Sequence, residues 1–461
     1  MTFRKTTSIL LIALMIITTV LGTTSESFAF ATFNKKSPFS GVRYSTYKHN
    51  KNQFDNYIIA NGVDVSAYQT ADNCNYNTAK KKGVDFAIIK VAGTFYGKKN
   101  LKMYIDEDWE KHFEKARSAG VMTGLYFFSQ AKTASEAAEE ANYICDVFEE
   151  GIMNLYGSNN AKSYLDLPIY MDYEFQDGCR IKNLSKSTRT KCAKKFCEII
   201  KSRGYAPGVY ASVSFLNNSV GGSTLSKSYD IWAAQYWNMC EYESAYTKWQ
   251  YSSSARISGI ENGKENVDVN FWYLDKNRVA ADSSLKDIAN CNIAKLNSVK
   301  YTGKAIKQTI SVKYGDTELE KGSDYTVGYI NNIKTGTAYA YVRGIGDYTG
   351  YKLISFKIEP KEDITVTPTN LKKLTAKKKS FKATWSKQAK NAIDGYQIQY
   401  SRYSNMTLDL KENIASYKTT SKTFDTNYRK KKYYVRIRTY KVVNGTTYYS
   451  TWSGKKTVKV K

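Results

Sequence analysis

Histidine is scarce in this chain of 461 residues, which contains only His49 and His112. Two histidines exclude a zinc site built on several imidazoles and argue against a Ser-His-Asp triad. The seven cysteines include no Cys-x-x-Cys pair, so neither a zinc ribbon nor a thioredoxin-like site is indicated. We therefore expect no metal and no cofactor, and chemistry based on carboxylates gains weight.

Apolar runs long enough to span a bilayer are also missing beyond the N-terminus. Residues 1–31 carry Arg4 and Lys5, then an apolar run, and then Ala29-Phe30-Ala31. This order of charged, apolar and small residues is typical of a secretory signal peptide. We expect the mature protein to be secreted, either free outside the cell or associated with the cell wall through its own modules.

Negative charge is in short supply, and the formal net charge is +27. Such a balance suits an anionic partner, which could be nucleic acid or an envelope rich in phosphate and carboxylate, and it also suits plain solubility. The lysines are scattered along the whole chain instead of gathering on one helix, which favours diffuse attraction over base reading. We expect anionic cell-wall polymers as partners and no nucleic acid.

From Tyr57 onward, apolar strands alternate with amphipathic helices. This alternation predicts a parallel sheet, and roughly 220 residues suit a (β/α) barrel. Because the last strands follow one another without full helices between them, we expect an irregular TIM-like barrel at residues 57–278. The expected strands are 57–66, 86–91, 121–128, 168–175, 207–210, 229–236, 248–251 and 267–270, and the expected helices are 76–83, 109–119, 135–150 and 187–203.

The strand expected at 168–175 carries two carboxylates, Asp172 and Glu174. Residues i and i+2 of a strand project to the same face, and like charges held close together beside apolar neighbours raise one pKa. A protonated carboxyl beside an ionised one can act as a general acid on a glycosidic bond. The plainer alternative, which the pair alone favours, is a strand end with two solvated acids.

Two further acids, Asp64 and Asp268, fall near the ends of the first and last expected strands. In a barrel the C-terminal strand ends meet at the face that carries the active site. Four acids from the first, middle and last strands would therefore converge there, which favours the functional interpretation over the solvated one.

Seven short segments follow one another along the expected barrel: Gly62–Ser66, Phe86–Lys90, Gly124–Phe128, Met171–Glu174, Trp232–Tyr236, Trp249–Tyr251 and Val267–Asn270. This ordered series resembles family 25 glycoside hydrolases, the bacterial and phage lysozymes that cut the β-1,4 bond after N-acetylmuramic acid in peptidoglycan. The resemblance covers about Tyr57 to Lys276. After the second strand, the chain has Ala92-Gly93 where many relatives carry Glu-Gly.

The resemblance implies a role for each acid. Glu174 is the general acid, and Asp172 steers or stabilises the 2-acetamido group of the substrate. Asp64 and Asp268 shape the floor of the site and tune that pair. The family mechanism is argued both as substrate-assisted retention and as inversion, and both stay open. The residues expected to line the sugar subsites are Tyr126, Gln235 and Tyr236.

The remaining segments lie on either side of the expected barrel. Residues 32–56 are polar without a clear period, so we expect a flexible leader there. We expect a linker at 279–297. Residues 298–362 resemble the small Ig-like modules of clostridial-type surface proteins, and 363–461 resemble fibronectin type III. The expected fold class is thus multidomain, with the barrel followed by two all-β sandwich modules.

Taken together, the sequence predicts a secreted monomeric muramidase that cleaves peptidoglycan between N-acetylmuramic acid and N-acetylglucosamine. One alternative is a chitinase-like N-acetylglucosaminidase, because those barrels also place acids on an Asp-x-Glu strand. Another is a catalytically silent adhesin that binds the cell wall, against which the intact Asp172 and Glu174 pair argues.

Overall fold

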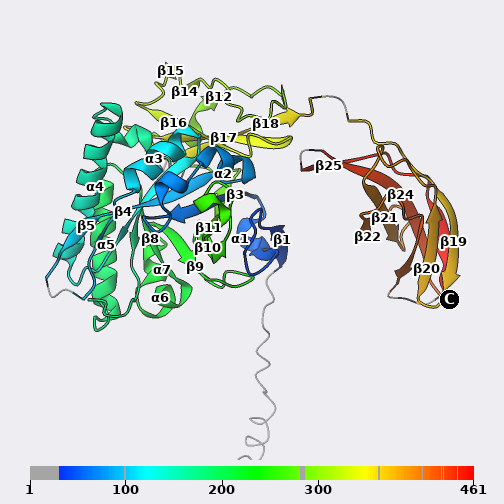
Figure 1. Cartoon of the computed structure of the whole chain (residues 1–461), viewed down its shortest axis with the longest axis horizontal. Coiled ribbons are helices and arrows are strands. Elements are labelled where there is room, and N and C mark those ends of the chain that lie inside the picture. Colours follow the sequence, from blue (N-terminus) through cyan, green and yellow to red (C-terminus); the bar gives the residue numbers. More distant parts are fainter. Residues whose placement is uncertain are drawn as a thin grey trace, which may run out of the picture.

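The structure is a computed structural model that describes residues 31–461 except 98–99, 281–285, 362–363, 408, 427, 429 and 444. The expected signal peptide therefore lies, apart from Ala31, outside the described residues. Figure 1 shows a helix-covered sheet, a layer of strands across one end of it, and a separate C-terminal β domain. Within the described part of the chain, no helix combines the length and apolar character that a membrane span needs.

The central sheet closes on itself and is barrel-like. Its strand order is β3-β11-β10-β9-β8-β7-β6-β4-β5, and β3 also pairs with β4. Six neighbouring pairs are parallel, namely β3–β4, β4–β6, β6–β7, β7–β8, β8–β9 and β9–β10. Strand β11 is antiparallel to both β10 and β3. All eight expected strands are present. The strands are β3 (Tyr57–Val65), β4 (Phe86–Thr94), β5 (Met103–Ile105), β6 (Met122–Phe128), β7 (Ile169–Asp172), β8 (Pro207–Ser212), β9 (Asp230–Ala234), β10 (Lys248–Ala255) and β11 (Val267–Asp275).

Helices cover the outside of this sheet, at the four positions expected from the sequence (Figure 1). Capping residues set the ends of these helices, as α2 shows. Asn75 caps α2 by accepting from the Thr78 N–H, and Gly83 ends it at φ 111°, a left-handed conformation that favours glycine. The helices are α2 (Tyr76–Lys82), α3 (Trp109–Ser118), α4 (Ala134–Tyr156), α5 (Lys186–Ser202), α6 (Val213–Asn218) and α7 (Gly222–Leu225), with 3-10 turns at Ala71–Asn73, Ala161–Tyr164 and Glu261–Gly263.

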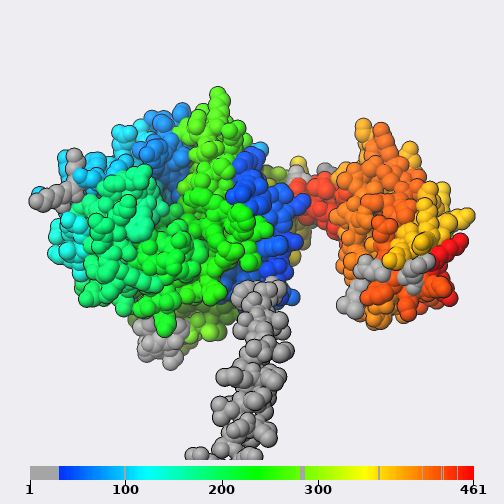
Figure 2. All heavy atoms as spheres, turned by 90° about the horizontal axis from the view of Figure 1, so that it is seen from below, coloured from blue at the N-terminus to red at the C-terminus, as the bar shows by residue number. Residues whose placement is uncertain are grey.

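The segment 32–56 is not the flexible leader that we expected. It forms β1 (Thr32–Lys36), β2 (Thr46–Asn50) and α1 (Lys51–Phe54), which we call the N-terminal arm. Tyr47 is completely buried, and its ring lies 4.6 Å from the ring of Tyr251. Polar residues dominate the arm, but its few rings point inward and cover the outer face of β10 and β11. Figure 2 shows the arm in blue against the green segment that includes these strands.

The residues after the barrel form a two-sheet module, which we call the middle module. One sheet has the order β12-β14-β15 and the other β13-β18-β17-β16. The strands are β12 (Asn292–Ile293), β13 (Val299–Lys300), β14 (Val312–Tyr314), β15 (Thr317–Glu318), β16 (Tyr325–Ile330), β17 (Gly336–Gly344) and β18 (Tyr351–Glu359), with a 3-10 turn at Ile288–Asn290.

Part of the expected linker at 279–297 belongs to this module. Ile288 and Cys291 are buried in its core, and Arg278 forms an ion pair of 2.7 Å with Asp287. The segment has no long apolar run because it contributes isolated core residues from a turn, so its pattern looks like that of a linker.

The middle module packs on the end of the barrel where the parallel strands begin. Trp272 of the barrel and Tyr341 of the module meet edge to face with ring centroids 5.1 Å apart, and both are buried. A Cβ atom on Gly328 would lie 2.2 Å from the Met122 sulfur, so a larger residue there would have to displace the Met122 side chain. The contact buries apolar side chains from both partners, which makes the module part of the barrel's support.

The C-terminal domain consists of a sheet β19-β20-β23 and a sheet β22-β21-β24-β25 with β26 paired to β24. It touches the middle module at a narrow contact, where Thr335 and Thr446 hydrogen-bond at 2.6 Å (Figure 2). The strands are β19 (Leu371–Lys377), β20 (Ser380–Trp385), β21 (Gly395–Ser401), β22 (Leu410–Ile414), β23 (Ser421–Asp425), β24 (Lys432–Val443), β25 (Thr446–Tyr449) and β26 (Lys456–Lys459).

Candidate active site

Four carboxylates come from three places in the barrel to its C-terminal end. Asp64 on β3 stands opposite Asp268 on β11 in the strand register. Asp172 is the last residue of β7, and Glu174 follows two residues later, so this strand is shorter than expected. The backbone nevertheless continues past the strand, because the Tyr173 N–H donates to the Tyr210 carbonyl at 3.1 Å. Buried Tyr173 points to the outer core, which leaves Asp172 and Glu174 toward the inside.

Gln250 on β10 connects the acids. Its side-chain nitrogen donates to both oxygens of Asp64, at 3.1 and 3.0 Å, and to Asp268 at 3.2 Å. Its side-chain oxygen accepts from the hydroxyls of Tyr210 and Tyr236, each at 2.8 Å. The amide is therefore fixed in orientation by two donors on one side and two carboxylates on the other.

Asn270 adds a second support under Asp64. Its amide nitrogen donates to Asp64 at 2.7 Å, and its oxygen accepts from the Trp232 indole N–H at 2.7 Å. Because Trp232 and Asn270 are both buried, this chain of hydrogen bonds has few alternative partners. Asp64 is held in one position.

All four acids bind protons more tightly than they do in water. Burial raises the pKa of Asp64 to about 6, against the hydrogen bonds from Asn270 and Gln250 that lower it. Burial, followed by the charges of Asp64 and Glu174, raises the pKa of Asp268 to about 8. The pKa of Asp172 is raised well above its ordinary value by burial first and by the Glu174 charge second. Burial also raises the pKa of Glu174. The cluster therefore retains protons near neutral pH.

Asp172 differs from the other acids in its hydrogen bonding. Its Oδ1 is buried without a hydrogen-bond partner within the described residues. Lys90 on β4 is the nearby cation, and its charge lowers the pKa values of Asp172 and Glu174 in opposition to burial. An unsatisfied buried acceptor is costly, so this oxygen is suited to receive a donor from a ligand.

Two hollows flank the acids. A hollow of about 360 Å³ is lined by Asp64, Asp268 and Tyr126, together with Tyr68 and Gln69. Another of about 510 Å³ lies on the side of Glu174 and Tyr210. Asp64 and Asp268 thus border one hollow and Glu174 borders the other, whereas buried Asp172 lines neither.

The three residues expected to line sugar subsites all border these hollows. Tyr126 of β6 lies beside Asp64 and Asp268, whereas Gln235 and Tyr236 lie on the Glu174 side. The Gln235 amide is engaged with the following loop, because it donates to Glu241 at 2.8 Å and accepts from the Glu241 N–H at 2.7 Å. Tyr236 is 44% exposed, so part of its ring is open to a ligand.

Exposed aromatic rings surround this end of the barrel on several loops. Tyr68 follows β3, Phe95 and Tyr96 follow β4, Phe175 follows β7, and Trp237 follows β9. Beside Trp237 the N-terminal arm adds Tyr44 in an edge-to-face contact at 6.0 Å, with the Arg43 guanidinium 5.0 Å from the Trp237 ring. Rings at such a rim suit the apolar faces of sugars.

Sequence reasoning did not assign roles to Gln250, Asn270, Tyr210 and Lys90. Three of them, Gln250, Asn270 and Lys90, stand in the segments that carried the family resemblance. The signal was present, because an amide within an otherwise apolar strand end must find partners when it is buried. Among the described residues, no group of three or more His, Cys, Asp or Glu side chains is arranged to hold a metal ion.

Comparison with known sequences gives a consistent match for the barrel. Residues 63–260 match the model of Glycosyl hydrolases family 25. The "Autolytic lysozyme" of Clostridium acetobutylicum is 24% identical over 208 residues, which are 45% of this chain and 54% of the relative. "Lysozyme M1" of Streptomyces globisporus is 25% identical over 208 residues, 43% of this chain and 64% of the relative. The chain thus spans between about half and two thirds of the length of these relatives.

Solved structures give weaker likenesses. The modular autolysin LytC from Streptococcus pneumoniae is 24% identical over 47% of each chain, with a TM-score of 0.38. The spore cortex lytic enzyme SleM from Clostridium perfringens is 14% identical, covers 87% of this chain and 98% of its own, and has a TM-score of 0.38. Residues 63–260 are thus similar to Glycosyl hydrolases family 25, and this similarity supports a glycoside hydrolase.

Proposed function

We propose that this protein is a secreted lysozyme that cleaves the β-1,4 bond between N-acetylmuramic acid and N-acetylglucosamine in peptidoglycan. The observation that carries the proposal is the convergence of four proton-retaining carboxylates between two hollows at the C-terminal end of the barrel. Acids whose environments hold protons near neutral pH suit protonation of a leaving oxygen.

In this proposal Glu174 is the general acid. Its position supports that role, because it borders the hollow on the Tyr210 side and its pKa is raised by burial. Proton transfer to the bridging oxygen accompanies cleavage of its bond to the anomeric carbon and leaves a hydroxyl on the departing sugar. Water supplies the new hydroxyl on the anomeric carbon, directly in an inverting course and after an intermediate in a retaining one. Glu174 is also half-buried, whereas Asp172 is buried, so Glu174 is the more accessible of the two acids.

Asp172 positions the 2-acetamido group of the substrate. Its unpartnered Oδ1 supports this role, because an acetamido N–H is the kind of donor that this oxygen lacks. Asp64 and Asp268 form the floor and are tied together through Gln250, and Tyr126, Gln235 and Tyr236 line the sugar subsites on the two sides.

The architecture that we propose around this site has three parts. The barrel is an irregular (β/α) barrel of the TIM type, supported by its closed strand order. The middle module is Ig-like and the C-terminal domain is of the fibronectin type III kind, each supported by two facing sheets around a separate core. Relative to the domain boundaries expected from the sequence, the N-terminal arm joins the barrel and residues 286–297 join the middle module.

Secretion and location follow from the same proposal. Peptidoglycan lies outside the cytoplasmic membrane, and the N-terminal pattern of residues 1–31 fits export. The net charge of +27 fits attraction to anionic wall polymers, and we propose a monomer.

Digestion of purified peptidoglycan tests the proposal. The wild-type chain should lower the turbidity of a wall suspension, and chemical reduction of the products should label muramic acid at the new reducing ends. Labelled glucosamine ends instead would favour the chitinase-like alternative. Binding to the wall without any new reducing ends would favour the adhesin.

A further inference from the structure

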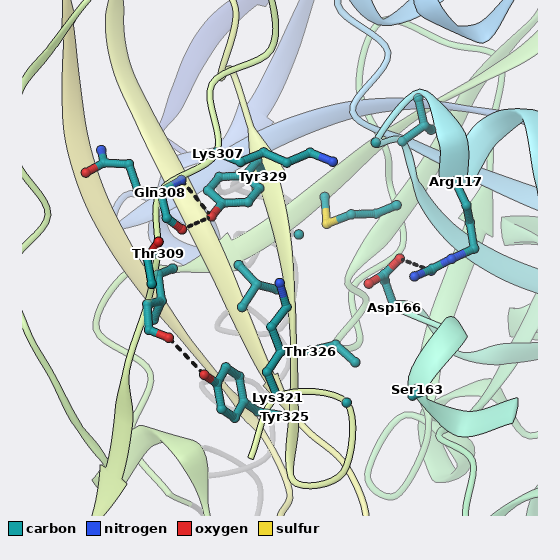
Figure 3. A pocket seen from close by; sticks show the side chains of 17 residues that line it. Arg117, Ser163, Asp166, Lys307, Gln308, Thr309, Lys321, Tyr325, Thr326 and Tyr329 are labelled. Carbon is teal, nitrogen blue, oxygen red and sulfur yellow. Dashed lines mark hydrogen bonds and ion pairs between the residues drawn. The ribbon is translucent and has the colours of Figure 1, made fainter. Parts of the chain in front are cut away.

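A large hollow lies far from the acids, at the seam between the barrel and the middle module. It has a volume of about 720 Å³ and is lined by 17 residues (Figure 3). The barrel contributes the region of Arg117, Met122 and Asp166, at the end where β6 begins. The module contributes β16 and the segment 307–310. A volume of this size is typical of ligand sites, which often lie between domains.

The charged side chains that line this hollow are mostly cationic. Arg117, Lys307 and Lys321 line it, and Asp166 is the acid that accompanies them. Asp166 is already engaged by Arg117, at 3.0 Å. Within the described residues, Lys307 and Lys321 form no ion pair, and Figure 3 shows both side chains reaching into the space between the module and the barrel. Two uncompensated ammonium groups therefore face one hollow.

The walls of the hollow are fixed. The Tyr329 hydroxyl donates to the Gln308 carbonyl at 2.6 Å, and the Tyr325 hydroxyl donates to the Ile310 carbonyl at 2.8 Å. These two bonds, drawn in Figure 3, hold the segment 307–310 against β16. Because this wall is tethered before any ligand arrives, little ordering is left to be done on binding.

Two buried polar groups near the seam lack partners. Thr326 lines the hollow and is 6% exposed, and its hydroxyl has no hydrogen-bond partner in the described chain. The buried Lys80 ammonium also has no hydrogen-bond partner in the described chain, but it lines a neighbouring hollow together with Asp85. Buried polar atoms are normally satisfied, so the Thr326 hydroxyl points to a ligand that brings an acceptor oxygen.

We propose that this seam hollow binds a phosphate group, either free or carried on an anionic polymer. Lysine ammonium groups bind phosphate as point charges, and a hydroxyl such as that of Thr326 can donate to a phosphate oxygen. Because the hollow is at the end of the barrel opposite the acids, an occupied site leaves the glycan-cleaving end open. This inference does not depend on the proposed cleavage.

Calorimetric titration of the full chain tests the site. The probes are inorganic phosphate and poly(glycerol phosphate), each at constant ionic strength. The test variant is Lys307→Ala/Lys321→Ala, and its matched control is Lys304→Ala/Lys313→Ala, which removes two exposed lysines of the same module that do not line the hollow. All four side chains are exposed, so both variants should fold.

We expect the test variant to bind at least about tenfold more weakly than wild type, and the control to bind within about twofold of it, because hydrogen bonds to charged groups carry that much affinity. Thr326→Val should weaken binding several-fold without any change of charge. Saturation by inorganic phosphate identifies the free ion as a sufficient ligand, and saturation by the polymer alone identifies a polymer site. Absence of binding to either probe, or equal losses in the test and control variants, would overturn the proposal.

Discussion

Asp64 and Asp268 face each other across adjacent antiparallel strands and accept hydrogen bonds from the same nitrogen of Gln250, at 3.0 and 3.2 Å. Two carboxylates this close do not ionise independently, and burial raises both pKa values, to about 6 for Asp64 and about 8 for Asp268. The floor of the site thus carries at least one proton near neutral pH. It holds that proton because burial disfavours the charged carboxylates, and the hydrogen bonds from Gln250 and Asn270 to Asp64 only partly oppose this effect.

The first prediction concerns the acid. Glu174→Gln keeps the shape of the side chain and removes the proton that would be transferred, so wall clearing should fall about 10²–10⁴-fold. The rate of turbidity loss in a peptidoglycan suspension measures this. Asp177→Asn is the matched control, because this acid is exposed on the same loop and should leave the rate unchanged. Clearing by Glu174→Gln at the wild-type rate would show that the acid is wrongly assigned.

The second prediction concerns pH and stability. The folded-state pKa of Asp268 is about 8 against an ordinary 3.8, so the folded chain binds this proton more tightly than the unfolded chain between those values. The free energy of unfolding should therefore fall as pH rises through that window. Asp268→Asn removes this loss, so the variant should gain stability relative to wild type from pH 4 to pH 8.

Denaturant unfolding at several pH values measures this difference. Asp64→Asn provides a comparison, since the raised pKa of Asp64 is about 6 and its relative gain should level off at lower pH than that of Asp268→Asn. A stability difference between Asp268→Asn and wild type that is constant from pH 4 to pH 8 would contradict the prediction.

The third prediction concerns Gln250. Gln250→Leu leaves the Tyr210 and Tyr236 hydroxyls without their acceptor and Asp64 and Asp268 without a shared donor. Unsatisfied buried groups should cost about 1–3 kcal/mol of unfolding free energy. Chemical denaturation measures the loss. Gln176→Leu removes an exposed amide that donates to Glu174 at 2.9 Å, and it should cost little stability. Equal stability of the two variants would mean that the Gln250 network is not supporting the floor.

The fourth prediction concerns the N-terminal arm. Tyr47 is fully buried against Trp249, Tyr251 and Phe271. Tyr47→Ala should therefore cost about 3–5 kcal/mol of unfolding free energy through the cavity that it leaves. Tyr47→Phe should cost little, since it keeps the ring that packs against Trp249, Tyr251 and Phe271. Tyr68→Ala, at a ring that is 89% exposed, is the surface control. A tolerated Tyr47→Ala would indicate that the arm is detached in solution.

The barrel was predictable from sequence because its signal is periodic. Apolar strands such as Phe86–Val91 and capped helices such as 76–83 can each be recognised from their own residues, and eight strands with four helices allow few folds. The acids were equally visible, because Asp172 and Glu174 stand at the end of an apolar run. Which face of the barrel they occupy followed from the fold.

The N-terminal arm was missed for the opposite reason. Its buried side chains, among them Tyr47, His49 and Phe54, are spread among lysines and asparagines, and they pack on strands more than 190 residues away in the chain. The hydrophobic periodicity of the arm's own sequence does not show such long-range packing. Gln250 was missed because its role depends on four partners from four other segments, and only the folded barrel brings them together.

The antiparallel strand β11 has a practical consequence for anyone who expresses a shortened enzyme. The family match ends at residue 260, whereas β11 begins at Val267 and joins β10 to β3. A fragment cut at that boundary would have an open sheet and would lack Asp268 and Asn270. A fragment that stops after β11 would still leave Trp272 and Met122 uncovered, since the middle module shields them. The shortest fragment that we expect to fold stably therefore extends from the N-terminal arm through β18.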